Sequence, residues 1–89
     1  MTGEIVIYSR QVRGTPKWLI QEYLEELGGI PDKEGVILGR GWRALLIPME
    51  PFKVGSLRVG QVRLEIEGSI TELDRLKTEL ERKLMRGGG

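Results

Sequence analysis

The stretch QVRLEIEG, at residues 61–68, alternates apolar and charged side chains with the two-residue period of a β-strand. The apolar positions are Val62, Leu64 and Ile66, and the charged positions are Arg63, Glu65 and Glu67. Because successive side chains of a strand point to opposite faces of its sheet, one face should meet a core and the other should meet water. The pattern therefore predicts a sheet that is covered on one side only.

The first cover for such a sheet is predicted at residues 15–27, where apolar side chains recur at helical spacing. Thr15 can cap this helix, and Pro16 suits the first helical position. Gly28 and Gly29 follow as a natural stop, because glycine adopts the left-handed conformation without steric cost. The apolar stripe is Leu19, Ile20, Tyr23, Leu24 and Leu27.

A second amphipathic helix is predicted over residues 69–85. Ser69 and Glu72 have the S-x-x-E spacing of a capping box, in which each side chain binds the backbone N–H of the other residue. Glu79 and Lys83 are spaced for an exposed ion pair at i,i+4. The buried stripe is expected to be Ile70, Leu73, Leu76, Leu80 and Leu84.

Strands are predicted for the segments outside these helices. Residues 4–12 are rich in β-branched and aromatic side chains, and residues 36–38 begin a second strand. The GRG sequence at 39–41 permits a tight reversal into WRALLIP at 42–48. Pro48 and Pro51 are expected to break the ladder around Met49 and Glu50, and Gly55 to mark a bulge or bend within residues 52–60.

The order of these elements predicts the α+β class: one strand, a helix, three or four strands, and a closing helix. Two helices cannot cover both faces of a sheet of this size. We therefore expect an antiparallel sheet with two helices packed on one face, built from residues 1–86 as a single domain. Residues 87–89 are expected to form a flexible glycine tail.

Composition excludes several classes of function. The chain of 89 residues contains no Cys and no His, so it lacks a thiol nucleophile, the Ser–His–Asp triad and the commonest zinc ligands. We expect a protein that is not an enzyme and that uses no cofactor or metal. The net charge of +1 favours neither nucleic acid nor membrane, and no segment approaches the ~20 apolar residues of a membrane helix. These features predict a cytoplasmic protein, and the absence of Cys and Asn beside abundant Glu and Arg is typical of heat adaptation.

The strand at 42–48 is apolar on both sides, which bears on partners. Either Trp42, Ala44 and Leu46 face the helices and Arg43, Leu45 and Ile47 face outward, or the reverse holds. One interpretation, without a functional role, is that long neighbouring side chains shield the outer face. The functional interpretation is that the outer face is a contact surface for a protein partner or for a homodimer. This surface would include Arg43, Leu45, Ile47 and Arg63.

Five stretches in the same order resemble a known family: WLIQEYLEELGG, EGV, EPFKVGSL, VRLEIEG and the closing RGGG. Together they resemble the C-terminal domain of MoaD-related proteins of thermophilic bacteria, from about Glu4 to Gly89. The resemblance implies a TBP-like fold of order β-α-β-β-β-β-α, in a domain of unknown function. In those proteins this domain follows a ubiquitin-like MoaD domain, the sulfur carrier of molybdopterin synthase, and Met1 is expected to lie where that domain would end. The resemblance thus implies a link to sulfur transfer or molybdopterin synthesis, without the carrier chemistry itself.

Three further hypotheses remain at this point. Gly87, Gly88 and Gly89 could form the tail of a carrier that an adenylating enzyme activates, or simply cap and follow the last helix. Arginines on the strands could bind nucleic acid, although Glu65 and Glu67 dilute the charge around Arg63. The segment at 48–57 could line a small-molecule pocket with Phe52 and Trp42 as its walls. The hypothesis that we favour is a non-catalytic accessory domain that binds another protein.

Overall fold

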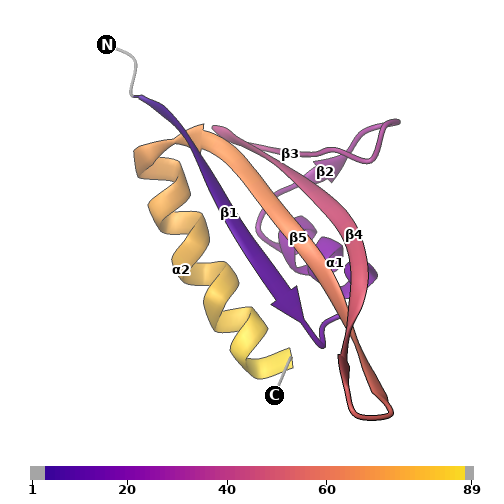
Figure 1. The fold of residues 1–89 in the computed structure, drawn as a ribbon. Helices are drawn as coiled ribbons and strands as arrows, with labels where there is room; N and C mark the ends of the chain where they lie inside the picture. The colour runs from indigo at the N-terminus through magenta and orange to yellow at the C-terminus, as the bar shows by residue number, and fades with distance from the viewer. Residues whose placement is uncertain (1–3, 88–89) are drawn as a thin grey trace.

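The computed structural model describes residues 4–87 and has the order β-α-β-β-β-β-α (Figure 1). This order confirms the predicted α+β class and gives four strands after the first helix. The elements are β1 (Ile5–Arg13), α1 (Lys17–Glu26), β2 (Ile30–Pro31), β3 (Ile37–Gly39), β4 (Trp42–Val54), β5 (Leu57–Ser69) and α2 (Ile70–Gly87).

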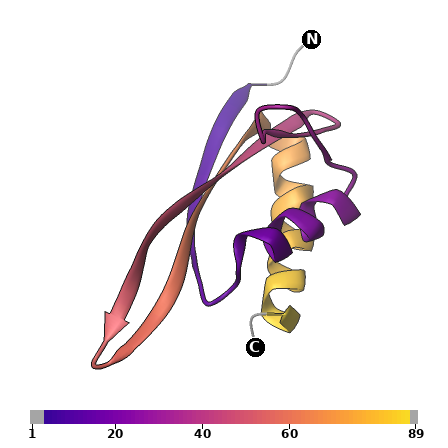
Figure 2. The ribbon, with the colours of Figure 1, turned by 90° about the vertical axis from the view of Figure 1, so that its right-hand side faces the viewer.

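The five strands form one sheet in the order β1-β5-β4-β3-β2, and each neighbouring pair is antiparallel. Both helices lie on the same side of this sheet, as Figure 2 shows. α2 packs against β1 and β5 and runs alongside β1 in Figure 1, while α1 packs against β3 and β4. The predicted arrangement, with two helices on one face, is confirmed.

The core fills the space between the sheet and the two helices. On β5, Leu64 and Ile66 are fully buried, and they meet Ile20 and Leu24 of α1 and Leu80 of α2 in a single apolar cluster. On β4, the side chains that face the helices are Trp42, Ala44 and Leu46. The sequence left two orientations open for this strand, and the structure has the first.

Trp42 is the bulkiest side chain of the core and is accommodated by glycines. A Cβ atom added to Gly39 would overlap the indole ring, and one added to Gly29 would lie 2.8 Å from the ring atom Cη2. Gly68, the cross-strand partner of Trp42, has the backbone of Gly41 and Trp42 against it in the same way. Glycine at these positions therefore lets the backbone approach the indole closely.

Helix α1 begins differently from the prediction. Pro16, not Thr15, is the N-cap residue, and no side chain caps the helix. The carbonyl of Pro16 accepts the backbone N–H groups of Leu19 and Ile20, and Thr15 is buried instead, with 4% of its surface exposed. The prediction was wrong because packing, rather than a cap bond, fixes Thr15.

Helix α2 forms half of the expected capping box. The Glu72 N–H donates to Ser69 Oγ at 3.3 Å, but the Ser69 N–H donates to the carbonyl of Gly41 at 3.3 Å and is not free for Glu72. The buried stripe runs from Leu73 to Leu84, whereas Ile70 lies on the helix flank with 45% of its surface exposed.

The ion pair expected within α2 is replaced by one between the two helices. Lys83 Nζ lies 2.5 Å from Glu26 Oε1 of α1, while Glu79 pairs with Arg82 at 3.6 Å. Lys83 therefore joins the ends of α1 and α2.

β4 and β5 continue beyond the rest of the sheet as a long hairpin. Pro48 stays in the ladder opposite Val62, so it does not break the pairing; the one irregularity lies between Met49 and Phe52. β1 ends opposite Gln61, which leaves residues 50–60 as a two-stranded arm that projects past β1 and both helices (Figure 2). Gly55, with φ of +59°, opens the tight turn at its tip.

Tyr8 and Arg10 of β1 tie this strand to α2. The Tyr8 hydroxyl donates to Glu81 Oε2 at 3.2 Å, and Arg10 forms an ion pair with the same carboxylate. The Lys77 ammonium lies 4.8 Å from the centre of the Tyr8 ring. Burial, followed by the charge of Glu81 and its hydrogen bond, raises the pKa of the Tyr8 phenol above its usual 10.0, although Arg10 opposes the shift.

The glycine contacts predict a contrast within β5. Gly68→Ala should destabilise the protein by about 1–3 kcal/mol, because the new methyl group meets backbone atoms that cannot move aside. Gly60→Ala is the matched control, since nothing lies within 4 Å of its Cβ position, and it should leave stability unchanged or slightly raised. Urea unfolding of the two variants measures the difference, and equal stabilities would contradict the close packing around Trp42.

The Tyr8 contact predicts a dependence on alkaline pH. Since the pKa of Tyr8 is higher in the folded state, the unfolded chain loses this proton first, so the contribution of Tyr8 to stability should be fully present below pH 10 and be lost above it. Glu81→Gln removes the negative charge but not the burial, so it should lower the pKa of Tyr8 part of the way. Absorbance titration of the phenolate, with Tyr8→Phe to identify its signal, measures this; a pKa unchanged in Glu81→Gln would leave burial as its only cause.

Candidate interaction surface

The sheet face that points away from the helices, here called the open face, carries rows of cross-strand neighbours. One row crosses the sheet from Ile7 through Glu67 and Arg43 to Leu38. The next contains Ser9, Glu65 and Leu45, and the third contains Gln11, Arg63 and Ile47. The strand register therefore builds this surface from four strands.

Large apolar side chains on the open face remain accessible to solvent. Ile7 is 71% exposed, Leu38 is 45% exposed and Leu45 is 40% exposed. Burying a side chain of this kind contributes roughly 1.5–3 kcal/mol, so a partner that covered several of them would gain substantial free energy. Several exposed apolar groups gathered on one face are typical of a contact surface rather than of scattered surface residues.

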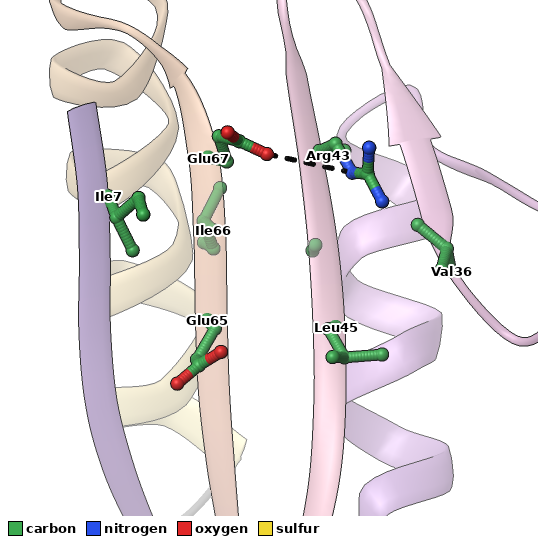
Figure 3. Close-up of a pocket in the computed structure, with 8 residues that line it drawn as sticks. Ile7, Val36, Arg43, Leu45, Glu65, Ile66 and Glu67 are labelled. Carbon is green, nitrogen blue, oxygen red and sulfur yellow. Dashed lines mark ion pairs between the residues drawn. The ribbon is translucent and has the colours of Figure 1, made fainter. Parts of the chain in front are cut away.

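The centre of the open face is hollowed into a depression of about 140 Å³ (Figure 3). The apolar side chains of Ile7, Leu45 and Val36 surround it with charged groups among them, whereas Ala44 and Ile66 turn their side chains into the core. Its lining consists of Ile7, Val36, Arg43, Ala44, Leu45, Glu65, Ile66 and Glu67. A hollow of this size fits one apolar side chain of another molecule, with charged groups available for hydrogen bonds around it.

The charges of the open face are paired. Arg43 Nε lies 3.8 Å from Glu67 Oε1, which is the pair drawn in Figure 3, and Arg63 Nε lies 3.2 Å from Glu65 Oε2. These side chains are between about one third and two thirds exposed, so each pair contributes only about 0–1 kcal/mol to stability. Arg43 and Arg63 thus each have a carboxylate beside them, and these pairs do not create the concentrated positive field that attracts nucleic acid.

The hairpin arm extends the apolar part of the open face. Phe52 pairs with Val59 and Val54 pairs with Leu57, and alternation along β5 places both pairs on the open-face side. The Arg13 guanidinium stacks over the Phe52 ring, 4.0 Å from its centre. Leu57 is 67% exposed and Val54 53%, so the arm offers apolar contact out to its tip.

The four residues predicted as an interface lie together on this surface. Arg43, Leu45 and Ile47 alternate along β4, and Arg63 is the cross-strand neighbour of Ile47. Three of them are exposed, whereas Ile47 is half-buried. Of the predicted tail, Gly87 is the last residue of α2, and Gly88 and Gly89 lie outside the described residues.

Sequence reasoning missed the parts of the open face that come from other strands. Ile7 and Leu38 join the row of Arg43 only through the pairing of β1 with β5 and of β3 with β4. The alternation of side chains could have assigned Ile7 and Leu38 to one face of their own strands. The sequence does not show, however, which strands are neighbours in the sheet.

The predicted pocket between Phe52 and Trp42 does not form. Trp42 begins β4 and points into the core opposite Gly68, whereas Phe52 lies on the arm near the other end of the strand and on the opposite face. Trp42 instead lines a groove of about 230 Å³ between the helices, beside Arg40, Arg75 and Glu72. The prediction was wrong because β4 continues straight through the segment that was taken for a loop.

Two negative findings apply to the described part of the chain. Residues 4–87 contain no group of three or more acidic, His or Cys side chains that could together hold a metal ion. No helix in the same range is long and apolar enough to cross a membrane.

Fold and surface together define a small α+β domain whose exposed sheet face combines apolar side chains with ion pairs. Comparison with protein families matches residues 8–89 to the family described as archaeal MoaD-like protein, and the chain belongs to this family. The match covers nearly all of the chain and agrees with the MoaD-related resemblance of its sequence motifs. A comparison with curated proteins gives no match.

Proposed function

We propose that this MoaD-related protein is a non-catalytic accessory domain that binds another protein through its open face, in sulfur transfer or molybdopterin cofactor synthesis. The observation that carries the proposal is the apolar surface around the depression, where Ile7, Leu38 and Leu45 stay exposed although the chain has two helices with which to cover apolar surface. Family membership supports the link to sulfur-carrier chemistry.

The open face fits a different protein better than a second copy of itself. A hollow face needs a protruding side chain from its partner, and two copies of the depression set against each other would leave a void. The matching surface is one that presents an apolar side chain beside both a basic and an acidic group, because Arg43 and Glu67 stand together at the depression. The homodimer that the sequence suggested for this face is therefore not our proposal.

A nucleic-acid role is not proposed. Glu67 and Glu65 neutralise Arg43 and Arg63, and a duplex or single strand requires a basic groove with few acids in it.

Partner capture tests the role of the open face. Leu45→Glu should abolish capture of a protein that the wild-type chain retains, because it puts a charge into the apolar surface while leaving the core intact. Trp18→Glu is the matched control, since Trp18 is also an exposed apolar residue, 66% exposed, but lies on α1. Captured proteins are compared by mass spectrometry, and deletion of residues 87–89 should not affect capture. Equal capture by Leu45→Glu and wild type would contradict the proposal.

The glycines at 87–89 support a second candidate function, because the family match extends through Gly89. In that case the chain would itself be a carrier whose tail an adenylating enzyme activates. α2 includes Gly87, so the last turn of the helix would have to unwind before an extended tail could enter an adenylation site.

The carrier hypothesis is tested by mass. After incubation with ATP, a sulfur donor and a MoeB-like adenylating enzyme, a carrier gains the mass that separates a thiocarboxylate from a carboxylate. We expect no gain, because the tail follows directly from a helix. Gly87→Pro is the control for access of the adenylating enzyme to the tail. Proline lacks the backbone N–H and its ring disfavours the last helical turn, so this turn should be weakened. A thiocarboxylate on the wild-type chain would establish the carrier function instead.

A further inference from the structure

The two outer edges of the sheet differ in how they are protected. β2 forms one edge with only two residues, and one of them, Pro31, has no N–H to offer. β1 forms the other edge with nine residues, contains no proline, and pairs with β5 along its whole length without a shift in register. Short strands, prolines, bulges and charged side chains are devices that keep sheet edges from pairing with other chains; β1 has none of the first three, and its charges, Arg10 and Arg13, lie in its second half.

The outer side of β1 is open in the described part of the chain. No described strand pairs with it there; α2 runs alongside the outer edge of β1 in Figure 1, and Figure 2 shows that α2 lies in the layer behind the sheet. Its alternate N–H and C=O groups are therefore free to continue the sheet. Ile5 and Ile7, which are 64% and 71% exposed, stand along this edge on the open face.

We propose that a second copy of the chain pairs with this edge, with the two β1 strands antiparallel about a two-fold axis at Ile7. The two sheets of five strands then become one sheet of ten. This interface shares Ile7 with the open face, but it is formed by backbone pairing along β1 and does not require a partner at the depression.

Side-chain complementarity selects the register. With the axis at Ile7, Ile7 meets its own copy, Val6 lies opposite Tyr8 of the second copy, and Glu4 lies opposite Arg10. With the axis at Ser9, Arg10 would instead face Tyr8 and Arg13 would face Ile5. Apolar and opposite-charge cross-strand pairs each stabilise a sheet, so the register centred on Ile7 is favoured.

Helix α2 supplies a second surface with the same symmetry. The contacts of Tyr8 with Lys77 and Glu81, and of Arg10 with Glu81, show that α2 runs in the same direction as β1. They also place Ile7 level with the middle of the helix. An axis at Ile7 therefore sets the two copies of α2 antiparallel and side by side.

The flank of α2 beside β1 is apolar at its ends and charged at its centre. At its ends lie Ile70 and Met85, which are 45% and 78% exposed, and between them lie Asp74, Lys77 and Glu81. Antiparallel helices bring Ile70 of one copy near Met85 of the other, whereas at the centre of the flank Asp74 lies near Glu81 of the other copy and Lys77 lies near its own copy. The apolar ends of the flank thus match the symmetry that the strand register requires, whereas the like charges at its centre weaken the contact between the two helices.

Disulfide trapping tests the register directly, because the natural chain has no cysteine. In Ile7→Cys the two Cα atoms of the pair should lie about 4.5–5.5 Å apart, within the range of a disulfide, and mild oxidation should give a covalent dimer. Ser9→Cys is the matched control on the same face of the same strand. Its two Cα atoms should be about 13 Å apart, too far to bridge, and it should stay monomeric on a non-reducing gel.

Sedimentation velocity of the unmodified chain tests the dimer itself, which we expect at micromolar concentrations. Ile7→Lys should raise the dimer dissociation constant at least about tenfold, whereas Leu45→Glu, which is directed at the open face, should leave it unchanged. Circular dichroism confirms that each variant is folded. A wild-type chain that sediments only as a monomer, or a disulfide in Ser9→Cys but not in Ile7→Cys, would overturn the proposal. Because the Leu45→Glu dimer survives whether or not the open face binds a partner, the two proposals fail separately.

Discussion

Burial of a single face of the sheet is the constraint on which the rest of the structure depends. Leu64 and Ile66 are completely buried while Glu65 and Glu67, between and beside them, remain partly exposed. Two helices provide enough apolar surface to cover one face of a sheet of this width and no more. The hydrophobic free energy of folding is therefore gained on one side, and the opposite face is left to solvent or to another molecule.

The same constraint explains how much of the fold could be predicted. Alternation in β5 and helical spacing in α1 and α2 are local patterns, and they predicted the element types, their order and the one-sided cover. The two possible orientations of β4 also followed from local alternation, and the burial of Trp42 in the structure shows which of them is present. Each of these features follows from side chains that lie within a few residues of one another.

The features that were predicted wrongly or missed depend on residues that are distant in the sequence. The Ser69 N–H binds the carbonyl of Gly41, so the capping box could not close on itself. Lys83 pairs with Glu26 of the other helix. The open face was predicted for β4 and β5 alone, because the neighbours of a strand cannot be read from its own sequence. Strand register, which brings Ile7 and Leu38 beside Arg43, is thus the information that only the structure supplies.

Geometry also separates the two candidate functions of the chain. The depression and the apolar arm lie on the open side of the sheet, whereas α2 lies in the helical layer behind it and ends there at Gly87 (Figures 1 and 2). For a protein that docks flat on the open face, the sheet therefore lies between that protein and the end of α2. To reach both surfaces at once, a single partner would have to extend around an edge of the sheet, and pairing of β1 with a second copy would close the edge nearest α2. Binding at the open face and chemistry at the glycine tail would consequently be independent of each other in this fold.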